Sequence, residues 1–462
     1  MVHLRLPYIT TGVVCLLVGV VSSWRTKQPH KPAILAAAIA FLSFLGAARE
    51  VIAAGHGRLF DPLLPWFEAD GLNAVPMAFY AALTIMVFVL APKRDGGGRA
   101  MAGMLLISLA TQTAYAAANW TALVSGWWLS CLPFVMGMFG GQRENKLSIG
   151  FLLASCTALT AAVVMTQSAA IDDLAHGGQL TFGLIILAVV CRKGLFPLHA
   201  GVVQAFEKGP LLPKVLLFNG HLGVLLVARA EATALPQIAR QAFDILSMAA
   251  VATVCIASLR AFAEKKPRRL LGFLCISQAS FMLAGIATAN AQGITGALIH
   301  WLVVSAASTG LICIVRVLEA RVSSAEDPLM HLGLAVKAPR LATFFLICGL
   351  ALIGLPGTLG FCGEDLMFQG MLKNHLISGI ILLVATVFNA INFLRLFNIL
   401  FLGVLPKHVT DIPDALPRER WPLTICVVFL IFGGLLPSTI IGWRADAAQV
   451  IEKALGAAGE GH

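Results

Sequence analysis

Five ionisable side chains interrupt stretches of the sequence that are otherwise apolar. They are Arg192 and Lys193 after LTFGLIILAVV, His221 in VLLFNGHLGVLLVAR, His300 in GALIHWLVVSAASTGLICIV, and Glu364 in LIGLPGTLGFCGEDLMF. An ionisable group inside a membrane span costs about 2.5–3.5 kcal/mol or more, so each is a functional candidate. Lysine, histidine and glutamate can take up and release a proton, and histidine does so near neutral pH. The set predicts a buried path for protons or other cations.

Each of these residues also has a structural interpretation. Arg192 and Lys193 are ordinary interfacial cations if the span ends at residue 191. However, the apolar sequence continues through GLFPLHAGVVQAF before the charged pair Glu207 and Lys208. A buried histidine can also serve only as a hydrogen-bond donor to a neighbouring helix. Two such histidines together with two charged, broken spans favour a polar axis through the membrane.

Four further charged residues are secondary candidates. Asp70 precedes an apolar run in EADGLNAVPM, where helix N-capping is the stronger interpretation. Arg395, in INFLRLFNILFLG, is interpreted as a structural anchor or as a group lining the path. Asp365 is adjacent to Glu364 and points to a different side of a helix. Lys214, in the eighth apolar run, completes this secondary set.

The elements that hold these residues are predicted to be membrane-spanning helices. Of the 462 residues, 58% are hydrophobic and only 12% are charged, whereas a soluble domain carries roughly 25% charged residues. A spanning helix needs about 20 apolar residues. We therefore predict an all-α polytopic membrane protein with about 14 transmembrane helices. The apolar runs are 7–24, 33–54, 71–91, 100–118, 120–140, 149–167, 178–191 continuing past Pro197, 211–229, 241–262, 270–290, 292–317, 340–372, 376–403 and 421–443.

Two of these runs are broken in a similar way. The seventh contains Pro197 close to Arg192 and Lys193, and the twelfth contains Pro356 among glycines, shortly before Glu364. Proline removes a helical hydrogen bond, and broken backbone is tolerated in a membrane only inside protein or beside a wet cavity. Paired broken spans are typical of transporters built from inverted repeats. We expect two inverted five-helix repeats, spans four to eight and nine to thirteen.

The loops predict the orientation of the chain. Lys and Arg gather in SWRTKQPHK, PKRDGGGR, GGQRENK, AEKKPRR and LPKHVTDIPDALPRER, whereas GHGRLFDPLLPWFEADG and QSAAIDDLAHGG are richer in acids. Positive loops face the cytoplasm. We predict a protein of the cell's inner membrane with both termini outside. The net charge of +10 then reflects topology, and a nucleic-acid partner is not expected.

Motifs for cofactors and metals are not found in the sequence. The ten cysteines are scattered singly, and there is no CxxC pair or Cys/His cluster. No glycine-rich phosphate loop or dinucleotide fingerprint follows a strand, and no convincing strand is present. We therefore expect the chain to carry no redox cofactor, nucleotide or metal of its own.

Five stretches of the sequence resemble the motifs of one family. RKGLFPLHAGVVQAFEKGP is similar to the family's seventh-span signature, RRLLGFLCISQASFMLAGIA to its KrLLAYSSISQMGFMLLG stretch, and LIGLPGTLGFCGEDLMF to its GLPxxxGFxGE span. The family is that of the antiporter-like membrane subunits of respiratory complex I, of Mrp-type cation/proton antiporters and of related hydrogenase complexes. ADGLN and FNAINFLRLFNILFLG resemble two weaker motifs. The resemblance covers about residues 65–405 and implies a fourteen-helix fold with a proton- or sodium-conducting polar axis. It suggests N-terminal helices over 1–110, an antiporter-like core over 111–405, and a C-terminal helix and tail over 406–462.

Carried over residue by residue, the resemblance is incomplete. The family's seventh-span lysine falls on Arg192, with Lys193 one residue later, so either residue is a candidate. His221 falls on an eighth-span lysine, and Glu364 on the twelfth-span charged residue. His300 matches the first histidine of an HxxxH pattern whose second position is valine here. Trp128 stands where the family has the glutamate that pairs with the seventh-span lysine, which puts ordinary complex I pumping in question.

Three functions remain open from the sequence. The first is a proton- or cation-translocating subunit of a larger membrane complex, as part of a translocase similar to NADH:quinone oxidoreductase. The second is the membrane subunit of a DAB-type inorganic-carbon uptake complex, with a soluble zinc-binding partner that hydrates carbon dioxide. The third is a degenerate scaffold subunit. In all three, the expected partners are other subunits and the lipid bilayer.

Overall fold

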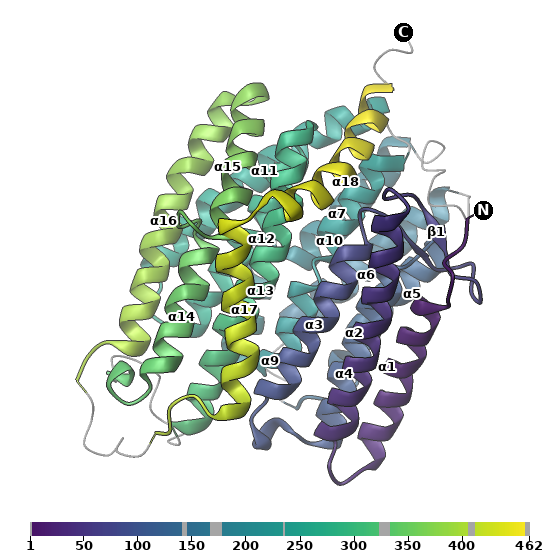
Figure 1. Cartoon of the computed structure of the whole chain (residues 1–462). Helices are drawn as coiled ribbons and strands as arrows, with labels where there is room; N and C mark the ends of the chain where they lie inside the picture. The colour runs from purple at the N-terminus through teal and green to yellow at the C-terminus, as the bar shows by residue number, and fades with distance from the viewer. Residues whose placement is uncertain are drawn as a thin grey trace.

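The protein is a bundle of helices, most of which run in nearly the same direction (Figure 1). The computed structural model describes residues 2–140, 146–166, 178–233, 236–322, 333–404 and 412–457. The predicted all-α polytopic fold is confirmed. The helices are α1 (Tyr8–Arg25), α2 (His30–Ala53), α3 (Ala74–Leu90), α4 (Gly98–Tyr115), α5 (Trp120–Val135), α6 (Lys146–Thr166), α7 (Gly178–Lys193), α8 (Ala200–Lys208), α9 (Leu211–Asn219), α10 (Leu222–Thr233), α11 (Pro236–Ala263), α12 (Pro267–Ile286), α13 (Ala291–Arg321), α14 (Pro339–Leu352), α15 (Leu359–Asn374), α16 (Leu376–Phe401), α17 (Pro417–Leu435) and α18 (Ser438–Ala457).

Eight segments of the described chain are long and apolar enough to cross a membrane, and the bent pair α17–α18 makes up to nine. The spans include α9 and α10 counted together over residues 211–230. Each of the predicted apolar runs coincides with one helix or with a pair of helices separated by a short break. The total of fourteen crossings and the two inverted repeats stay predictions.

The centre of the bundle is α13. This 31-residue helix is apolar on every side, and its most apolar stretch is entirely buried. A helix that is hydrophobic all round belongs in the interior, because no face of it favours water. In contrast, only one third of the residues in the most apolar stretch of α16 are buried, and side chains such as Val384 and Val387 are exposed. His300 therefore lies on a helix whose apolar part is entirely enclosed by the described residues.

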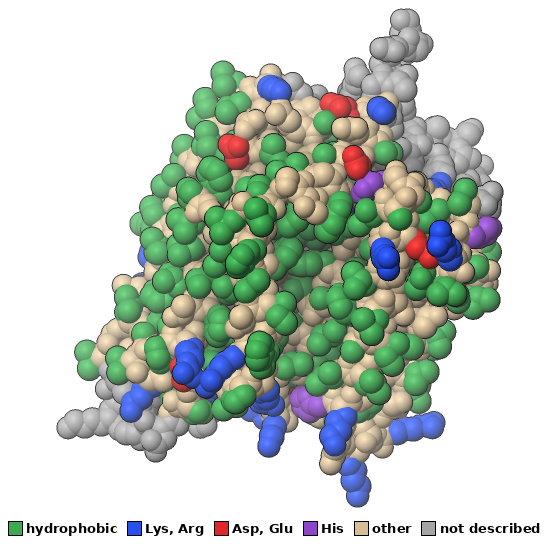
Figure 2. Space-filling view, in the orientation of Figure 1, with side chains coloured by type: hydrophobic (Ala, Val, Ile, Leu, Met, Phe, Trp, Pro, Cys, Tyr) green, Lys and Arg blue, Asp and Glu red, His purple; other side chains and the backbone are tan. Residues whose placement is uncertain are grey.

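Charged side chains concentrate at the ends of the bundle. Figure 2 shows Lys and Arg gathered at the lower end, around the loop that joins α1 to α2 and the start of α17. At this end Arg316 pairs with Asp95 at 2.5 Å, and Arg268 pairs with Glu319 at 2.5 Å. Between its ends, the face of the bundle shown in Figure 2 is mostly green apolar surface. This distribution suits a protein surrounded by lipid, with the predicted cytoplasmic loops on one side.

Two local features differ from the sequence predictions. A short antiparallel pair, β1 (Leu59–Phe60) and β2 (Glu68–Ala69), forms in the loop between α2 and α3, where no strand was predicted. The expected apolar run over 421–443 is also not one continuous span. It ends with α17 at Leu435, and α18 departs at an angle of 80°. Pro437 explains the end of α17, because a proline disfavours helical geometry in the residue before it.

Candidate functional site

The predicted breaks in spans seven and twelve are present and share one geometry. α7 ends at Lys193, and Gly194 adopts a left-handed conformation with φ 71°. After α14, Gly354 does the same with φ 70°. At each break the following leucine, Leu195 or Leu355, donates its N–H to the carbonyl five residues earlier, at 3.2 and 3.0 Å. This is a Schellman-type helix end that favours glycine, so both helices stop for the same physical reason.

A third break, which the sequence analysis did not predict, divides span eight. α9 ends at Asn219 and α10 begins at Leu222, with His221 between them at φ 42°. A positive φ is uncommon in residues other than glycine and marks a locally constrained backbone. The residues Asn219 and Gly220 inside an apolar run were the only sequence signal for this break, because both are weak helix formers.

The break in span eight frees backbone carbonyls, and buried side chains satisfy them. The carbonyl of Leu216 accepts a hydrogen bond from the Tyr80 hydroxyl at 2.9 Å, and that of Gly220 accepts one from the Tyr115 hydroxyl. The ammonium of Lys193 donates to the carbonyl of Phe218 at 3.0 Å. Unpaired carbonyls are too costly inside a membrane, so this arrangement makes the break possible.

Lys193 and His221 are brought into direct contact at this break. The Lys193 ammonium lies 2.7 Å from His221 Nδ1, and both side chains are buried. Among the described residues Lys193 has no acidic partner, and its only hydrogen bonds are to His221 and the Phe218 carbonyl. Both residues line a small cavity, in which the centre of a water molecule can occupy a volume of about 10 Å³. That is close to the minimum volume that holds one water molecule.

Arg192 points away from this pair, toward α5. Its guanidinium stacks 4.5 Å from the ring of Trp127 and donates to the Ser130 hydroxyl at 2.7 Å. Consecutive helical residues point about 100° apart, so the two adjacent cations serve different neighbours. Trp128, which occupies the family's glutamate position, is 38% exposed and donates to Thr160 at 3.0 Å. Its side chain contacts neither cation.

Polar side chains of α13 extend the site beyond the break. Asn219 donates to Thr309 Oγ1 at 2.9 Å and accepts from Ser308 Oγ at 3.0 Å. The Ser305 hydroxyl donates to the Asn219 carbonyl at 3.2 Å. The sequence analysis did not single out Asn219. These bonds fix the end of α9 against the central helix.

His300 lies on α13, fully buried. Its Nε2 is 2.6 Å from Gln278 Oε1 on α12, and its ring packs 5.7 Å from that of Phe281. Nδ1 of this ring and Nε2 of His221 have no hydrogen-bond partner among the described residues. The two histidines do not touch, but Trp301, next to His300 in sequence, lies 6.3 Å from the His221 ring. Each histidine thus has one bonded and one free ring nitrogen.

Glu364 and Asp365 have opposite environments. Glu364 is 4% exposed and has no hydrogen-bond or ion-pair partner among the described residues. Its carboxylate fits against Gly354 in the break, since a Cβ there would lie 2.3 Å from Oε2. Asp365 is exposed and accepts from Gln369 at 2.7 Å. The adjacent Gly363 packs against the His300 backbone, which brings the start of α15 beside the centre of α13.

The secondary candidates fall into separate places. Asp70 is not the N-cap of α3, which is Asn73. Instead, the Asp70 carboxylate accepts hydrogen bonds from backbone N–H groups in the turn that runs from Asp70 to Asn73, and it forms an ion pair with Arg229. Arg395 donates to the backbone carbonyl of Glu264 at 3.1 Å and to two carbonyls in the last turn of α11, so it anchors the end of this helix and the loop that follows. Lys214 is 3% exposed and is treated below.

The structure therefore joins part of the predicted set and leaves the rest apart. Lys193 and His221 touch, whereas His300 and Glu364 follow as separate polar positions without a continuous chain of hydrogen bonds between side chains. In the described part of the chain no three His, Cys, Asp or Glu side chains are grouped so that they can hold a metal ion. The arrangement suits proton transfer between neighbouring groups and intervening water.

Comparison with protein families decides which family this fold and these sites represent. The family described as NADH:quinone oxidoreductase/Mrp antiporter, TM, matches residues 117–389, more than half of the chain. The chain belongs to this family. It is thus an antiporter-like, multi-pass membrane protein of the complex I and Mrp type, as the sequence motifs predicted.

Relatives of the chain are named as subunits of quinone oxidoreductases. The chain is 26% identical over 328 residues to "NADH-quinone oxidoreductase subunit M" of Rickettsia bellii (strain RML369-C), covering 66% of this chain and 66% of that protein. The chain thus spans just under two thirds of that relative's length. It is 25% identical over 414 residues to "NAD(P)H-quinone oxidoreductase chain 4 1" of Synechococcus elongatus (strain ATCC 33912 / PCC 7942 / FACHB-805), covering 82% of this chain and 75% of that protein.

Solved structures of family members have the same fold. A chain of respiratory complex I from Thermus thermophilus with bound NADH superposes with a TM-score of 0.83 at 22% identity, covering 96% of this chain and 100% of that chain. A chain of the Mrp complex from Dietzia sp. DQ12-45-1b gives 0.83 at 17% identity, covering 97% and 99%. These likenesses establish the fold.

Proposed function

We propose that this protein moves protons through the membrane as a subunit of a multi-subunit complex, using Lys193, His221, His300 and Glu364 in that order. The observation that carries the proposal is the contact of 2.7 Å between Lys193 Nζ and His221 Nδ1. Both groups exchange protons, both are buried, and the pair lies at a broken helix, where backbone and side chains can rearrange.

The chemistry of the first step follows from the donors and acceptors. A charged lysine has three N–H donors and no acceptor, so His221 Nδ1 must accept while the lysine holds the proton. The neutral ring then carries its own proton on Nε2, which is the free nitrogen. When Lys193 gives its proton to Nδ1, the ring can release the other proton from Nε2 toward the next site. The pair can thus pass a proton from Lys193 to His221 Nε2, and the ring must return to its Nε2–H form before the next transfer.

The second half of the path needs water or motion between its groups. His300 Nδ1 is the free nitrogen on the central helix, and Glu364 is the carboxylate without a partner at the break after α14. Water that bridges buried polar groups conducts protons without large movements of the chain. A carboxylate with no cation beside it can hold the arriving proton and then pass it on. Glu364 is therefore proposed as the last group before the outward half of the path.

The groups along the path favour protons over sodium. Hard metal cations bind clusters of oxygen ligands, such as carboxylates, carbonyls and water. The proposed path begins with two nitrogen groups, Lys193 and His221, and continues to a third at His300. An ammonium group repels a sodium ion, whereas it can donate a proton and, as the neutral amine, accept one.

Arg192 is proposed as a structural cation in this scheme. Arginine does not lose its proton in proteins, so it cannot act as a relay. Its contacts with Trp127 and Ser130 fix the end of α7 against α5.

Coupling to partner subunits is proposed to be electrostatic. A change of charge at one buried site alters the proton affinity of the next, because a low dielectric weakens screening. Each proton that crosses a potential of 100 mV carries about 2.3 kcal/mol. Relatives named as NADH-quinone oxidoreductase subunits suggest that the partners belong to a respiratory complex. The chain itself supplies the ion path.

The test measures proton flux in membrane vesicles that contain the full chain with its native partner subunits. Lys193→Met and Glu364→Gln keep size and remove proton exchange, so each is expected to lower the flux about a hundredfold or more. Lys208→Met and Asp365→Asn are matched controls, because both residues are exposed neighbours of the same kind, and they should conduct like wild type. Undiminished flux in both path variants, with normal assembly, would overturn the proposal.

The other two functions stay predictions. Inorganic-carbon uptake requires a soluble zinc-binding partner, and the scaffold function requires a complex that conducts no ions through this subunit. Purification of the tagged chain from its native membrane, followed by identification of the associated subunits, discriminates between them. Quinone or hydrogenase subunits favour proton translocation in a respiratory complex, whereas a large soluble zinc protein favours carbon uptake.

A further inference from the structure

Lys214 is a buried cation that the proposed path does not use. It lies on α9, one turn before Phe218, and is only 3% exposed. Its ammonium has no hydrogen-bond partner among the described residues. Lysines near a membrane surface usually extend their ammonium into water. The Lys214 ammonium is instead enclosed, so anchoring at the interface does not explain this residue.

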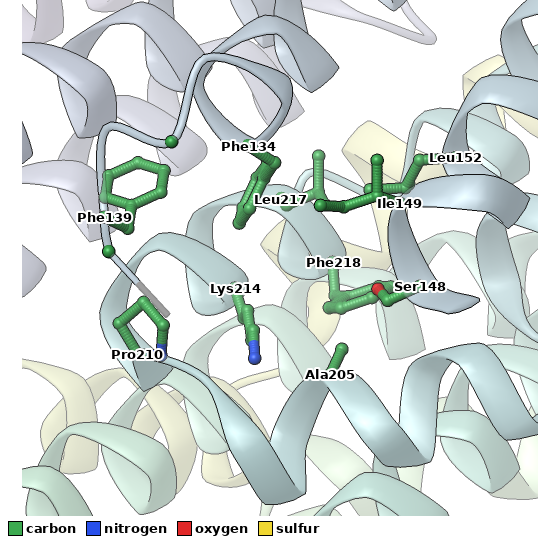
Figure 3. Close-up of a pocket in the computed structure, with 12 residues that line it drawn as sticks. Phe134, Phe139, Ser148, Ile149, Leu152, Ala205, Pro210, Lys214, Leu217 and Phe218 are labelled. Carbon is green, nitrogen blue, oxygen red and sulfur yellow. The ribbon is translucent and has the colours of Figure 1, made fainter. Parts of the chain in front are cut away.

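The ammonium of Lys214 points into a cavity (Figure 3). The lining comes from α5, α6, α8 and α9 and is mostly apolar, with Ser148 as its other polar side chain. The centre of a water molecule can occupy a volume of about 20 Å³ in this cavity. A water molecule needs at least about 10–15 Å³ by this measure, so the cavity has room for one or two. The lysine and these waters can form a short hydrogen-bonded chain.

Three cavities follow one another from the predicted cytoplasmic face to Lys193. The outermost cavity is lined by Arg94, Asp95 and Arg99, and the centre of a water molecule can occupy about 300 Å³ of it. It shares Phe139 and Pro210 with the Lys214 cavity.

The Lys214 cavity in turn shares Phe218 with the small cavity at Lys193 and His221. The Phe218 ring stacks 5.6 Å from that of Phe206, and its carbonyl accepts the hydrogen bond from Lys193. Phe218 is therefore the partition between the last two cavities. A movement of this ring joins them, and the same residue holds the Lys193 ammonium.

We infer that Lys214 is the intake relay that supplies protons to Lys193, with Phe218 as the gate between them. The ammonium of Lys214 gives a proton to cavity water, which passes it to Lys193 after Lys193 has given its own proton to His221. Lys214 then takes a proton from water in the outer cavity, so no other reactant is needed. The inference rests on the proposed proton path and adds its cytoplasmic half.

The test uses the same vesicles as above and compares initial rates of proton flux. Lys214→Met removes the relay and should lower the rate about tenfold or more. Lys208→Met, an exposed lysine at the end of α8, is the matched control and should leave the rate unchanged. Ser148→Leu fills the cavity without altering Lys214 and should also slow the flux, which covers the case that Lys214→Met does not assemble.

Rescue distinguishes a relay from a structural residue. In the double variant Lys214→Met with Phe218→Ala, the enlarged passage lets water reach Lys193 directly, and part of the lost rate should return. A lysine that only supports packing gives a double variant that is worse than either single one, which overturns the inference. Wild-type flux in Lys214→Met, while Lys193→Met is inactive, overturns only the intake relay. Full flux in Lys193→Met overturns the underlying path.

Discussion

The glutamate that the family carries on its fifth span provides a sharp test of how α5 is oriented. Trp128 occupies that position in the sequence. The family resemblance alone would therefore predict that Trp128→Glu restores the missing partner of the seventh-span lysine. In the structure Trp128 is 38% exposed on the outer side of α5 and bonds to Thr160. We predict that the new carboxylate would face lipid and form no pair with Lys193.

The cost of this substitution follows from what the side chain meets. An ionised group in the middle of a span costs about 2.5–3.5 kcal/mol. Loss of the hydrogen bond from Trp128 to Thr160 adds about 1 kcal/mol. Trp128→Glu should therefore destabilise the protein by about 4 kcal/mol when ionised, with no compensating ion pair.

The matched variant is Ser130→Asp, two residues along the same helix. Ser130 already accepts a hydrogen bond of 2.7 Å from Arg192 and is fully buried. An aspartate there would keep this bond and turn it into a hydrogen-bonded ion pair with Arg192. Because a buried ion pair roughly balances its own desolvation, the stability should stay within about 1 kcal/mol of wild type. The two variants add the same charge but face different neighbours.

Thermal unfolding in lipid nanodiscs measures both variants, and proton flux in vesicles gives a second measure. We expect a clear loss of stability and no gain of flux in Trp128→Glu, and near wild-type stability in Ser130→Asp. The opposite result, with Trp128→Glu stable and more active while Ser130→Asp unfolds, would refute the assigned orientation of α5. It would also restore the pairing that the family resemblance implies.

Three further predictions concern the breaks and one loop. Gly194→Ala should lower stability in a thermal unfolding assay by about 1–2 kcal/mol, because a side chain disfavours φ 71°, and an unchanged midpoint contradicts this. Tyr115→Phe removes the donor to the Gly220 carbonyl and should cost about 1–3 kcal/mol by the same assay, whereas a neutral effect means that another donor replaces it. Burial acts to raise the pKa of Glu264 in the loop after α11, but hydrogen bonds, first from Arg269, outweigh burial and lower it below 4.5. Its stabilisation is thus present above pH 4.5 and lost as the pH falls through the lowered value. Glu264→Gln should flatten this part of a stability–pH profile, and an unaltered profile contradicts the assignment.

The broken spans show how far sequence reasoning could reach. Proline and glycine act locally on the backbone, so the breaks near Pro197 and Pro356 were visible in the sequence. The break at Gly220 and His221 was not predicted, since no proline marks it. It exists because Tyr80, Tyr115 and Lys193, from three other helices, satisfy the freed carbonyls of α9. Such long-range compensation cannot be read from a local pattern.

The charged candidates show the same division. Composition and hydropathy determined that Lys193, His221, His300 and Glu364 lie within membrane segments, because the cost of burying an ionisable group depends on residue type. Asp70, in contrast, was interpreted as an N-cap from its position before a helix. The structure gives Asn73 that position and pairs Asp70 with Arg229, which is 159 residues away. A partner so distant in sequence leaves no local trace.

The sequence by itself determined the class of fold, the two proline-marked breaks in the spans and the residues able to exchange protons, because these depend on local properties of the chain. Only the tertiary structure decided which of the adjacent cations Arg192 and Lys193 meets His221. Side-chain direction depends on helix rotation, and rotation is set by packing against other helices. The same packing enclosed Lys214 beside its cavity and turned Trp128 outward, so the arrangement of the proposed ion path is a property of the folded chain.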